Sequence, residues 1–145
     1  PIQPALVRKK NGNIMAFMRD SGDDPPRVHI SESADLGETW TPTIKSEIPN
    51  TASVELLVLK DGRLAFLGND ITDGRYRFQL YLSEDEGKTW KWKIPIENVA
   101  PGKGGFSYPS LIQTPDGMLR MTYSSHIGTD QKSIKYVVLD PSKIK

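Results

Sequence analysis

Ser83-Glu84-Asp85-Glu86-Gly87-Lys88-Thr89-Trp90 is the stretch that decides the fold, and it has a copy 50 residues earlier, Ser33-Ala34-Asp35-Leu36-Gly37-Glu38-Thr39-Trp40. Both copies read S-x-D-x-G-x-T-W, and each follows a run of residues with strand character. The aspartate can accept hydrogen bonds from turn amides and the glycine can take a positive φ, so each copy is predicted to form a tight hairpin. The tryptophan is expected to bury its ring beside the next sheet while its N–H keeps a partner.

The predicted role of this motif is structural, so its aspartates are not candidate catalytic carboxylates. Its defining residues are Ser33, Asp35, Gly37, Trp40, Ser83, Asp85, Gly87 and Trp90.

A second motif, an Asn-Gly or Asp-Gly turn between two apolar runs, occurs three times, at Lys10–Ile14, Lys60–Leu64 and Pro115–Leu119. Such dipeptides are the strongest short signals for a β-hairpin. The turn glycines are spaced by 50 and 55 residues, so the chain is predicted to consist of three repeated units.

Each unit is predicted to be a small antiparallel sheet. The expected strands are Gln3–Lys9, Asn13–Met18, Arg27–Ser31 and Thr41–Lys45, then Ser53–Leu59, Leu64–Leu67, Arg75–Leu82 and Lys91–Ile96, then Tyr108–Thr114, Met118–Tyr123 and Ser133–Leu139. Four short strands repeated about every 50 residues are typical of β-propeller blades. The prediction is therefore an all-β chain with about three four-stranded antiparallel blades of a six-bladed propeller, spanning residues 1–50, 51–100 and 101–145.

An open arc of blades leaves apolar faces and strand edges exposed. Three explanations stay open: half of a propeller cut from a longer chain, a subunit that closes the ring by association, or a designed half. The expected partner is accordingly a missing N-terminal half-propeller or a second copy of the chain.

Composition excludes several other classes of function. A net charge of +1 with interspersed signs gives no electrostatic case for nucleic acid. No apolar run approaches the roughly 18 residues needed to cross a bilayer, so no membrane partner is expected. The chain has no cysteine and only two histidines, His29 and His126, so neither a metal site nor a cofactor is predicted.

Alignment of the three units on their turn glycines places six polar residues at equivalent positions. Gln3, Ser53 and Tyr108 start the first strand of each unit, and Arg19, Asn69 and Ser124 end the second. In a hairpin these two positions share one edge of the sheet. In a propeller that edge faces the mouth of the axial channel, so the pattern predicts a polar cleft. The alternative is that these residues are solvated strand ends.

Arg75 opens the third strand of the second unit, and its loop is expected to place it at the same mouth. The alternative is a surface arginine paired with Asp73 or Asp70. Glu55 shares the face of Ser53 and is expected to add a carboxylate to the channel wall.

Two arginines beside a tyrosine indicate a site for an acidic sugar. Guanidinium groups bind a planar carboxylate through two parallel charge-assisted hydrogen bonds. A phenol becomes a nucleophile when a neighbouring carboxylate takes its proton. Unlike aspartate or glutamate, a neutral tyrosine does not repel the carboxylate of such a substrate.

On these residues the chain resembles the C-terminal half of bacterial sialidase (neuraminidase)-like propellers of the Asp-box (BNR) repeat superfamily. The S-x-D-x-G-x-T-W stretches match the Asp boxes of that family, and Tyr108-Pro109-Ser110-Leu111 resembles the strand with its nucleophilic tyrosine. Arg19 matches the second arginine of the carboxylate-binding triad of the family, and Arg75 matches the third. The resemblance implies an extracellular or periplasmic exo-α-sialidase, acting on sialic acid or another acidic sugar.

The chain departs from that family at two points. Gln3 stands where the resemblance implies the glutamate that activates the tyrosine, and an amide cannot serve as a base. The first arginine of the triad and the acid/base aspartate belong to the N-terminal half in that family. Two alternatives therefore stay open, a non-catalytic glycan-binding or assembly module and a polysaccharide lyase with Tyr108 as base.

Overall fold

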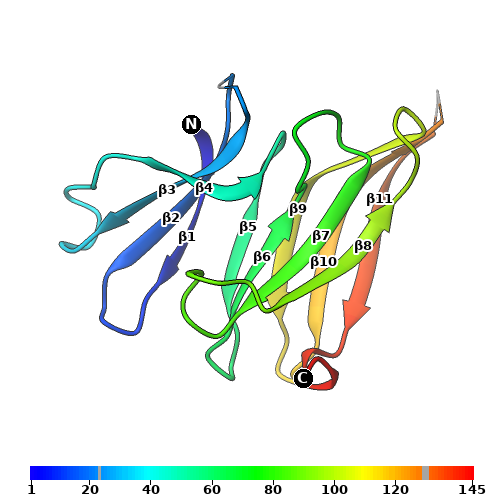
Figure 1. The fold of residues 1–145 in the computed structure, drawn as a ribbon. Helices are drawn as coiled ribbons and strands as arrows, with labels where there is room; N and C mark the ends of the chain where they lie inside the picture. Colours follow the sequence, from blue (N-terminus) through cyan, green and yellow to red (C-terminus); the bar gives the residue numbers. More distant parts are fainter. Residues whose placement is uncertain (23, 129–130) are drawn as a thin grey trace.

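The computed structural model describes residues 1–22, 24–128 and 131–145, which form three antiparallel sheets standing side by side (Figure 1). The sheet orders are β1-β2-β3-β4, β5-β6-β7-β8 and β11-β10-β9. The strands are β1 (Ile2–Arg8), β2 (Ile14–Arg19), β3 (Arg27–Ser33), β4 (Ile44–Pro49), β5 (Glu55–Val58), β6 (Leu64–Gly68), β7 (Arg77–Ser83), β8 (Trp92–Asn98), β9 (Gly104–Gln113), β10 (Leu119–Ile127) and β11 (Gln131–Leu139). A short 3-10 helix, Pro141–Lys143, follows β11. The predicted all-β class and propeller-like blades are confirmed.

The three predicted Asn-Gly and Asp-Gly turns form at the starts of the three sheets. The amides of Gly12, Gly62 and Gly117 donate to the carbonyl oxygens of Lys9, Leu59 and Thr114, at 3.0, 2.9 and 2.9 Å. All three glycines have positive φ, at 93°, 88° and 86°. A residue with a Cβ is strained there, which explains the recurrence of glycine at this turn position.

Several predicted strand boundaries shift, and two of these shifts have a clear local cause. The predicted strand Thr41–Lys45 is wrong at its start, because the Thr41 amide and hydroxyl bind the backbone of Glu32 and close the preceding hairpin before β4 begins. In the third sheet, β9 begins at Gly104, earlier than the predicted start at Tyr108. It does so because β10 continues to Ile127, which pairs with Gly104.

Three predicted site residues lie outside the strands in which they were expected, because Asn69 follows the end of β6 at Gly68. Ser53 precedes β5 and Arg75 precedes β7. The carbonyl oxygen of Arg75 accepts a hydrogen bond from the amide of Phe106, at 2.9 Å. This residue therefore binds the third sheet instead of extending β7.

Both copies of the S-x-D-x-G-x-T-W motif form the predicted tight hairpin. In the first, the Ser33 hydroxyl donates to Asp35 and accepts from the amide of Gly37, both at 2.8 Å, and the Thr39 amide donates to Asp35 at 2.8 Å. The second copy repeats these three bonds at 2.7, 2.8 and 2.8 Å. The threonine hydroxyl, the threonine amide and the serine hydroxyl lower the pKa of Asp35 and of Asp85 to about 2.

The ring packing expected of the two tryptophans is confirmed for Trp90 and wrong for Trp40, and the expected N–H partner is present at Trp40. Trp90 lies among the rings of Phe17, Phe66 and Tyr81, with centroid separations of 6.2, 6.0 and 5.8 Å. Trp40 is 40% exposed, although its Nε1–H donates to the Gly37 carbonyl at 3.1 Å. The reason is positional: Trp90 faces the first sheet, whereas no described sheet lies on the side of Trp40.

The core consists of two apolar layers, one between each pair of neighbouring sheets. The first layer contains Ala5, Val7, Met15, Phe17, Val28 and Ile48 of the first sheet against Val54, Leu56, Leu64, Phe66 and Tyr81. The second contains Leu59, Ala65, Leu67, Phe78, Leu80 and Leu82 against Phe106, Leu111, Leu119, Met121 and Tyr123. Burying these faces holds the three sheets in a fixed arrangement.

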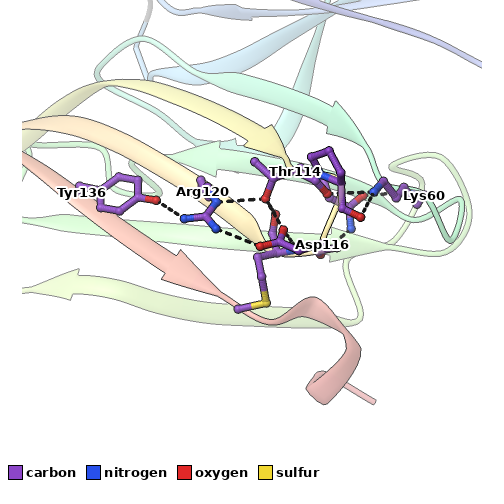
Figure 2. A network of polar contacts seen from close by, with 9 residues as sticks. Lys60, Thr114, Asp116, Arg120 and Tyr136 are labelled. Atoms are coloured by element: carbon purple, nitrogen blue, oxygen red, sulfur yellow. Dashed lines mark hydrogen bonds and ion pairs between the residues drawn. The ribbon is translucent and has the colours of Figure 1, made fainter.

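At the turn edge, a polar network joins the second sheet to the third (Figure 2). The Lys60 ammonium donates to the carbonyl oxygens of Thr114 and Pro115, at 2.8 and 3.0 Å. Arg120 donates to the Thr114 hydroxyl at 3.0 Å and to the Asp116 carboxylate at 2.9 Å. The network lies at the edge opposite the predicted site, so it supports the arrangement of the sheets and takes no part in the cleft. In the described part of the chain, no helix is long and apolar enough to cross a membrane.

Candidate functional site

Gln3 and Tyr108 occupy matching β-bulges in the first strands of the first and third sheets. Opposite β2, the register shifts between Ile2 and Pro4, so Gln3 is left unpaired. The shift between Thr122 and Ser124 of β10 does the same around Tyr108. Both residues have positive φ, at 54° and 55°.

Positive φ is strained for residues with a Cβ, and such strain clusters at functional sites. A proline follows each bulge residue, Pro4 and Pro109, and a proline has no N–H to offer to a neighbouring strand. The bulges therefore occur where the sequence removes a ladder hydrogen bond, and they put an unpaired residue at equivalent places in two sheets.

The structure brings the candidate residues together in two pairs. The Arg75 guanidinium carbon lies 5.7 Å from the centroid of the Tyr108 ring, a cation–π distance. In the first sheet, Arg19 donates from Nη1 to the Gln3 amide oxygen at 3.2 Å. Each arginine thus lies beside a bulge residue, and Tyr108 is 52% exposed.

Arg75 is not paired with Asp70, which was one alternative for it. The Asp70 carboxylate instead binds Arg77, with Nε and Oδ1 at 2.5 Å, and accepts from the Tyr81 hydroxyl at 2.7 Å. Burial, and then the hydrogen bond to Asp70, raise the pKa of the Tyr81 phenol. The Tyr81 hydroxyl therefore has a structural role.

The other predicted residues contribute buried or half-buried polar groups. The Asn69 side chain is fully buried, and its Nδ2 donates to the carbonyl oxygen of Arg77 at 2.7 Å. Ser53 is buried, and Ser124 lies in β10 opposite Ser107, next to the bulge at Tyr108. Burial raises the pKa of Glu55, whose Oε1 accepts from the Leu56 amide at 3.2 Å.

Sequence reasoning missed Asn50, which follows β4 and is fully buried. It lines a pocket together with Ile2, Arg19, Asp20, Ser21, Gly22, Pro26 and Thr51. In sequence, an asparagine between a proline and a threonine reads as an ordinary turn residue. Its proximity to Arg19 follows from the packing of the β4–β5 link against the β2–β3 loop, which no local pattern reveals.

Within residues 1–22, 24–128 and 131–145, no group of three or more His, Cys, Asp or Glu side chains is placed to hold a metal ion. The polar groups around the site are guanidinium, amide, hydroxyl and phenol groups, together with the carboxylates of Glu55 and Asp20. This combination suits an anionic, hydroxyl-bearing molecule.

The fold is that of a sialidase-like β-propeller, of which the chain holds three sheets. The sequence matches the family model of the BNR repeat-like domain over residues 1–121, and the chain belongs to this family. Comparison with curated proteins gave no match.

Solved structures with this fold include sialidases and arabinanases. The intramolecular trans-sialidase from Ruminococcus gnavus, in complex with oseltamivir carboxylate, is 20% identical with a TM-score of 0.74, over 98% of this chain and 33% of that one. The α-L-arabinanase from Penicillium chrysogenum, complexed with arabinobiose, is 22% identical with a TM-score of 0.71, over 96% and 46%. The endo-arabinase from Bacteroides thetaiotaomicron is 18% identical with a TM-score of 0.67, over 97% and 57%. The chain thus spans between a third and just over half of these structures.

Proposed function

We propose that this chain is the C-terminal half of a six-bladed, sialidase-like glycoside hydrolase that binds sialic acid or another acidic sugar. Arg19 and Arg75 bind the carboxylate of the sugar, and Tyr108 is the nucleophile. The observation that carries the proposal is the placement of the Arg75 guanidinium over the ring of Tyr108, itself held at a strained bulge.

The proposed reaction forms a bond between the Tyr108 oxygen and the anomeric carbon while the glycosidic carbon–oxygen bond breaks. The leaving oxygen takes a proton from an acid outside this chain, and the phenol proton passes to a base. Gln3 cannot be that base. Glu55 supplies a carboxylate on the innermost strand of the second sheet, and its raised pKa favours proton uptake.

Carboxylate-dependent binding is the first test. The chain is titrated with N-acetylneuraminic acid and with its methyl ester, and binding is followed by NMR. Arg19→Ala and Arg75→Ala are each expected to weaken binding of the acid about tenfold, because a charge-assisted hydrogen bond contributes roughly 1.5 kcal/mol. Arg8→Ala, at the turn edge, is the matched control. Equal binding of acid and ester contradicts the proposal.

The role of Tyr108 is tested with a fluorinated sialosyl fluoride. Fluoride leaves without a general acid, so the trap needs only the nucleophile and the base that takes the phenol proton. A covalent adduct on Tyr108, detected by mass spectrometry and missing from Tyr108→Phe, is the expected result. Carboxylate-dependent binding without an adduct favours the second candidate, a glycan-binding propeller without turnover. The hydrogen bond from Arg19 to Gln3 supports this candidate, because the amide beside the arginine cannot serve as a base.

We also propose that a further blade, and not a second copy of the chain, covers the outer face of the first sheet. That face carries Pro4, Leu6, Ala16, Ser31 and Trp40, and the residues 50 positions later are Val54, Leu56, Phe66, Tyr81 and Trp90. In the second sheet this set packs against the neighbouring blade. The occupant is expected to present apolar side chains as Met15 and Phe17 do there.

The outer face of the third sheet is a poor match for that role. Arg120 and Thr122 stand in β10 where the repeat has Met15 and Phe17 in β2, and Arg120 is already bound to Asp116. A ring of two copies would bury this guanidinium against Trp40, which costs desolvation free energy. Light scattering is expected to show no discrete two-copy ring, and a closed dimer with a buried Trp40 would contradict this proposal.

A further inference from the structure

Buried polar atoms without a partner gather at one edge of the first two sheets. Among the described residues, six buried side-chain nitrogen or oxygen atoms have no hydrogen-bond partner. Five of them are Arg19 Nε, both polar atoms of Asn50, Ser53 Oγ and Asn69 Oδ1, and the sixth is Ser125 Oγ. An unmade hydrogen bond of a buried group costs free energy, so such groups are rare and call for a specific explanation.

Asn50 and Arg19 line the same pocket. The backbone around Asn50 is fixed, because its amide donates to the Pro26 carbonyl at 3.3 Å and the Thr51 hydroxyl donates to the Gly74 carbonyl. This β4–β5 link lies at the same edge of the sheets as the N-terminus (Figure 1). Both polar atoms of the fully buried Asn50 side chain therefore make no hydrogen bond, although this side chain lies beside the proposed carboxylate-binding arginine.

The other groups around the pocket narrow the class of ligand. The Asp20 carboxylate lines it too; it accepts from the amides of Gly22 and Arg27, at 2.8 and 3.1 Å, and its Oδ2 lies 3.2 Å from His29 Nε2. Its negative charge disfavours a second anionic group. An asparagine amide both donates from its NH2 group and accepts at its oxygen, so a hydroxyl or an amide can use both atoms, whereas a carboxylate only accepts and an ammonium group only donates.

We propose that Asn50 forms a subsite that takes a neutral hydroxyl or amide substituent of the sugar whose carboxylate Arg19 binds. The subsite deepens the proposed function and rests on it. Arg19 provides charge recognition, and Asn50 distinguishes a substituted sugar acid from a bare carboxylate. An unpaired buried amide also rejects ligands that lack the substituent, because its hydrogen bonds then stay unmade.

The test compares two probes on the whole chain by NMR of the side-chain signals. Acetate, a carboxylate alone, is expected to shift the Arg19 Nε–H signal and leave the Asn50 amide signals in place. N-acetylneuraminic acid is expected to shift both. Asn50→Ala is expected to weaken the sugar about tenfold and to leave acetate affinity unchanged, whereas Asn98→Ala, on an exposed strand end, changes neither.

The outcomes separate the subsite from the proposed function. If the sugar shifts Arg19 while the Asn50 signals stay in place, or if Asn50→Ala binds the sugar as the native chain does, the subsite is overturned and the carboxylate site stands. If neither probe shifts Arg19, the proposed function falls. Should Asn50→Ala fail to fold, Asn50→Ser and the signals of the native chain give the same decision.

Discussion

Trp40 and Trp90 end two copies of one motif, yet they have different surroundings. Their hairpins make the same serine–aspartate, serine–glycine and aspartate–threonine hydrogen bonds, with lengths that agree within 0.1 Å. Trp90 is enclosed by three aromatic rings, whereas Trp40 is 40% exposed. The motif thus folds from its own residues, and burial of its tryptophan depends on a neighbouring sheet.

The same contrast extends over the whole faces that carry these rings. Leu56 is 4% exposed in the first apolar layer, while its repeat equivalent Leu6 is 54% exposed. On the outer face of the first sheet, Ala16 occupies the position that Phe66 has in the second sheet, so the outer face has a smaller side chain there. Burial, and not the hairpin motif, therefore provides the free energy that holds one blade on the next.

The largest expected effect comes from deleting the same side chain on the two faces. Leu56→Ala is expected to lower the free energy of unfolding by about 2–5 kcal/mol, because it leaves a cavity in a closed layer. Leu6→Ala removes the same atoms from an exposed position and is expected to change it by less than about 0.5 kcal/mol. Urea denaturation measures both. Similar losses of unfolding free energy for the two variants would mean that the outer face of the first sheet is covered in solution.

A smaller difference is expected for the two tryptophans. Trp90→Ala is expected to cost about 2 kcal/mol, less than a fully buried tryptophan because Trp90 is only partly buried. Trp40→Ala is expected to cost less than about 1 kcal/mol. The fluorescence of the variants reports the same difference, since the emission of Trp40 is expected at longer wavelength than that of Trp90. If Trp40 emitted at a wavelength as short as that of Trp90, its ring would be buried in the isolated chain, which contradicts this prediction.

The sequence predicts the blades better than it predicts the site. The Asn-Gly and Asp-Gly turns and the S-x-D-x-G-x-T-W motif act through their own backbone, so their spacing was enough to place the sheets. The equivalence of Gln3 and Tyr108 was also predictable, and the prolines after them signal the bulges. The exposure of Trp40 and the unsatisfied amide of Asn50 were not, because both depend on which segments meet in space.

The smallest expected difference is between the two motif aspartates, which should titrate alike despite the unlike tryptophans. Hydrogen bonds lower the pKa of Asp35 and of Asp85 to about 2, from 3.8. A lowered pKa in the folded state adds stability above pH about 4, and this contribution is lost as the pH falls towards 2. Carboxyl-carbon NMR is expected to give matching titrations, and Asp35→Asn and Asp85→Asn should each remove one of them. Because the bonds come from within each hairpin, a titration of Asp85 well below that of Asp35 would show that the neighbouring blade also stabilises the charge.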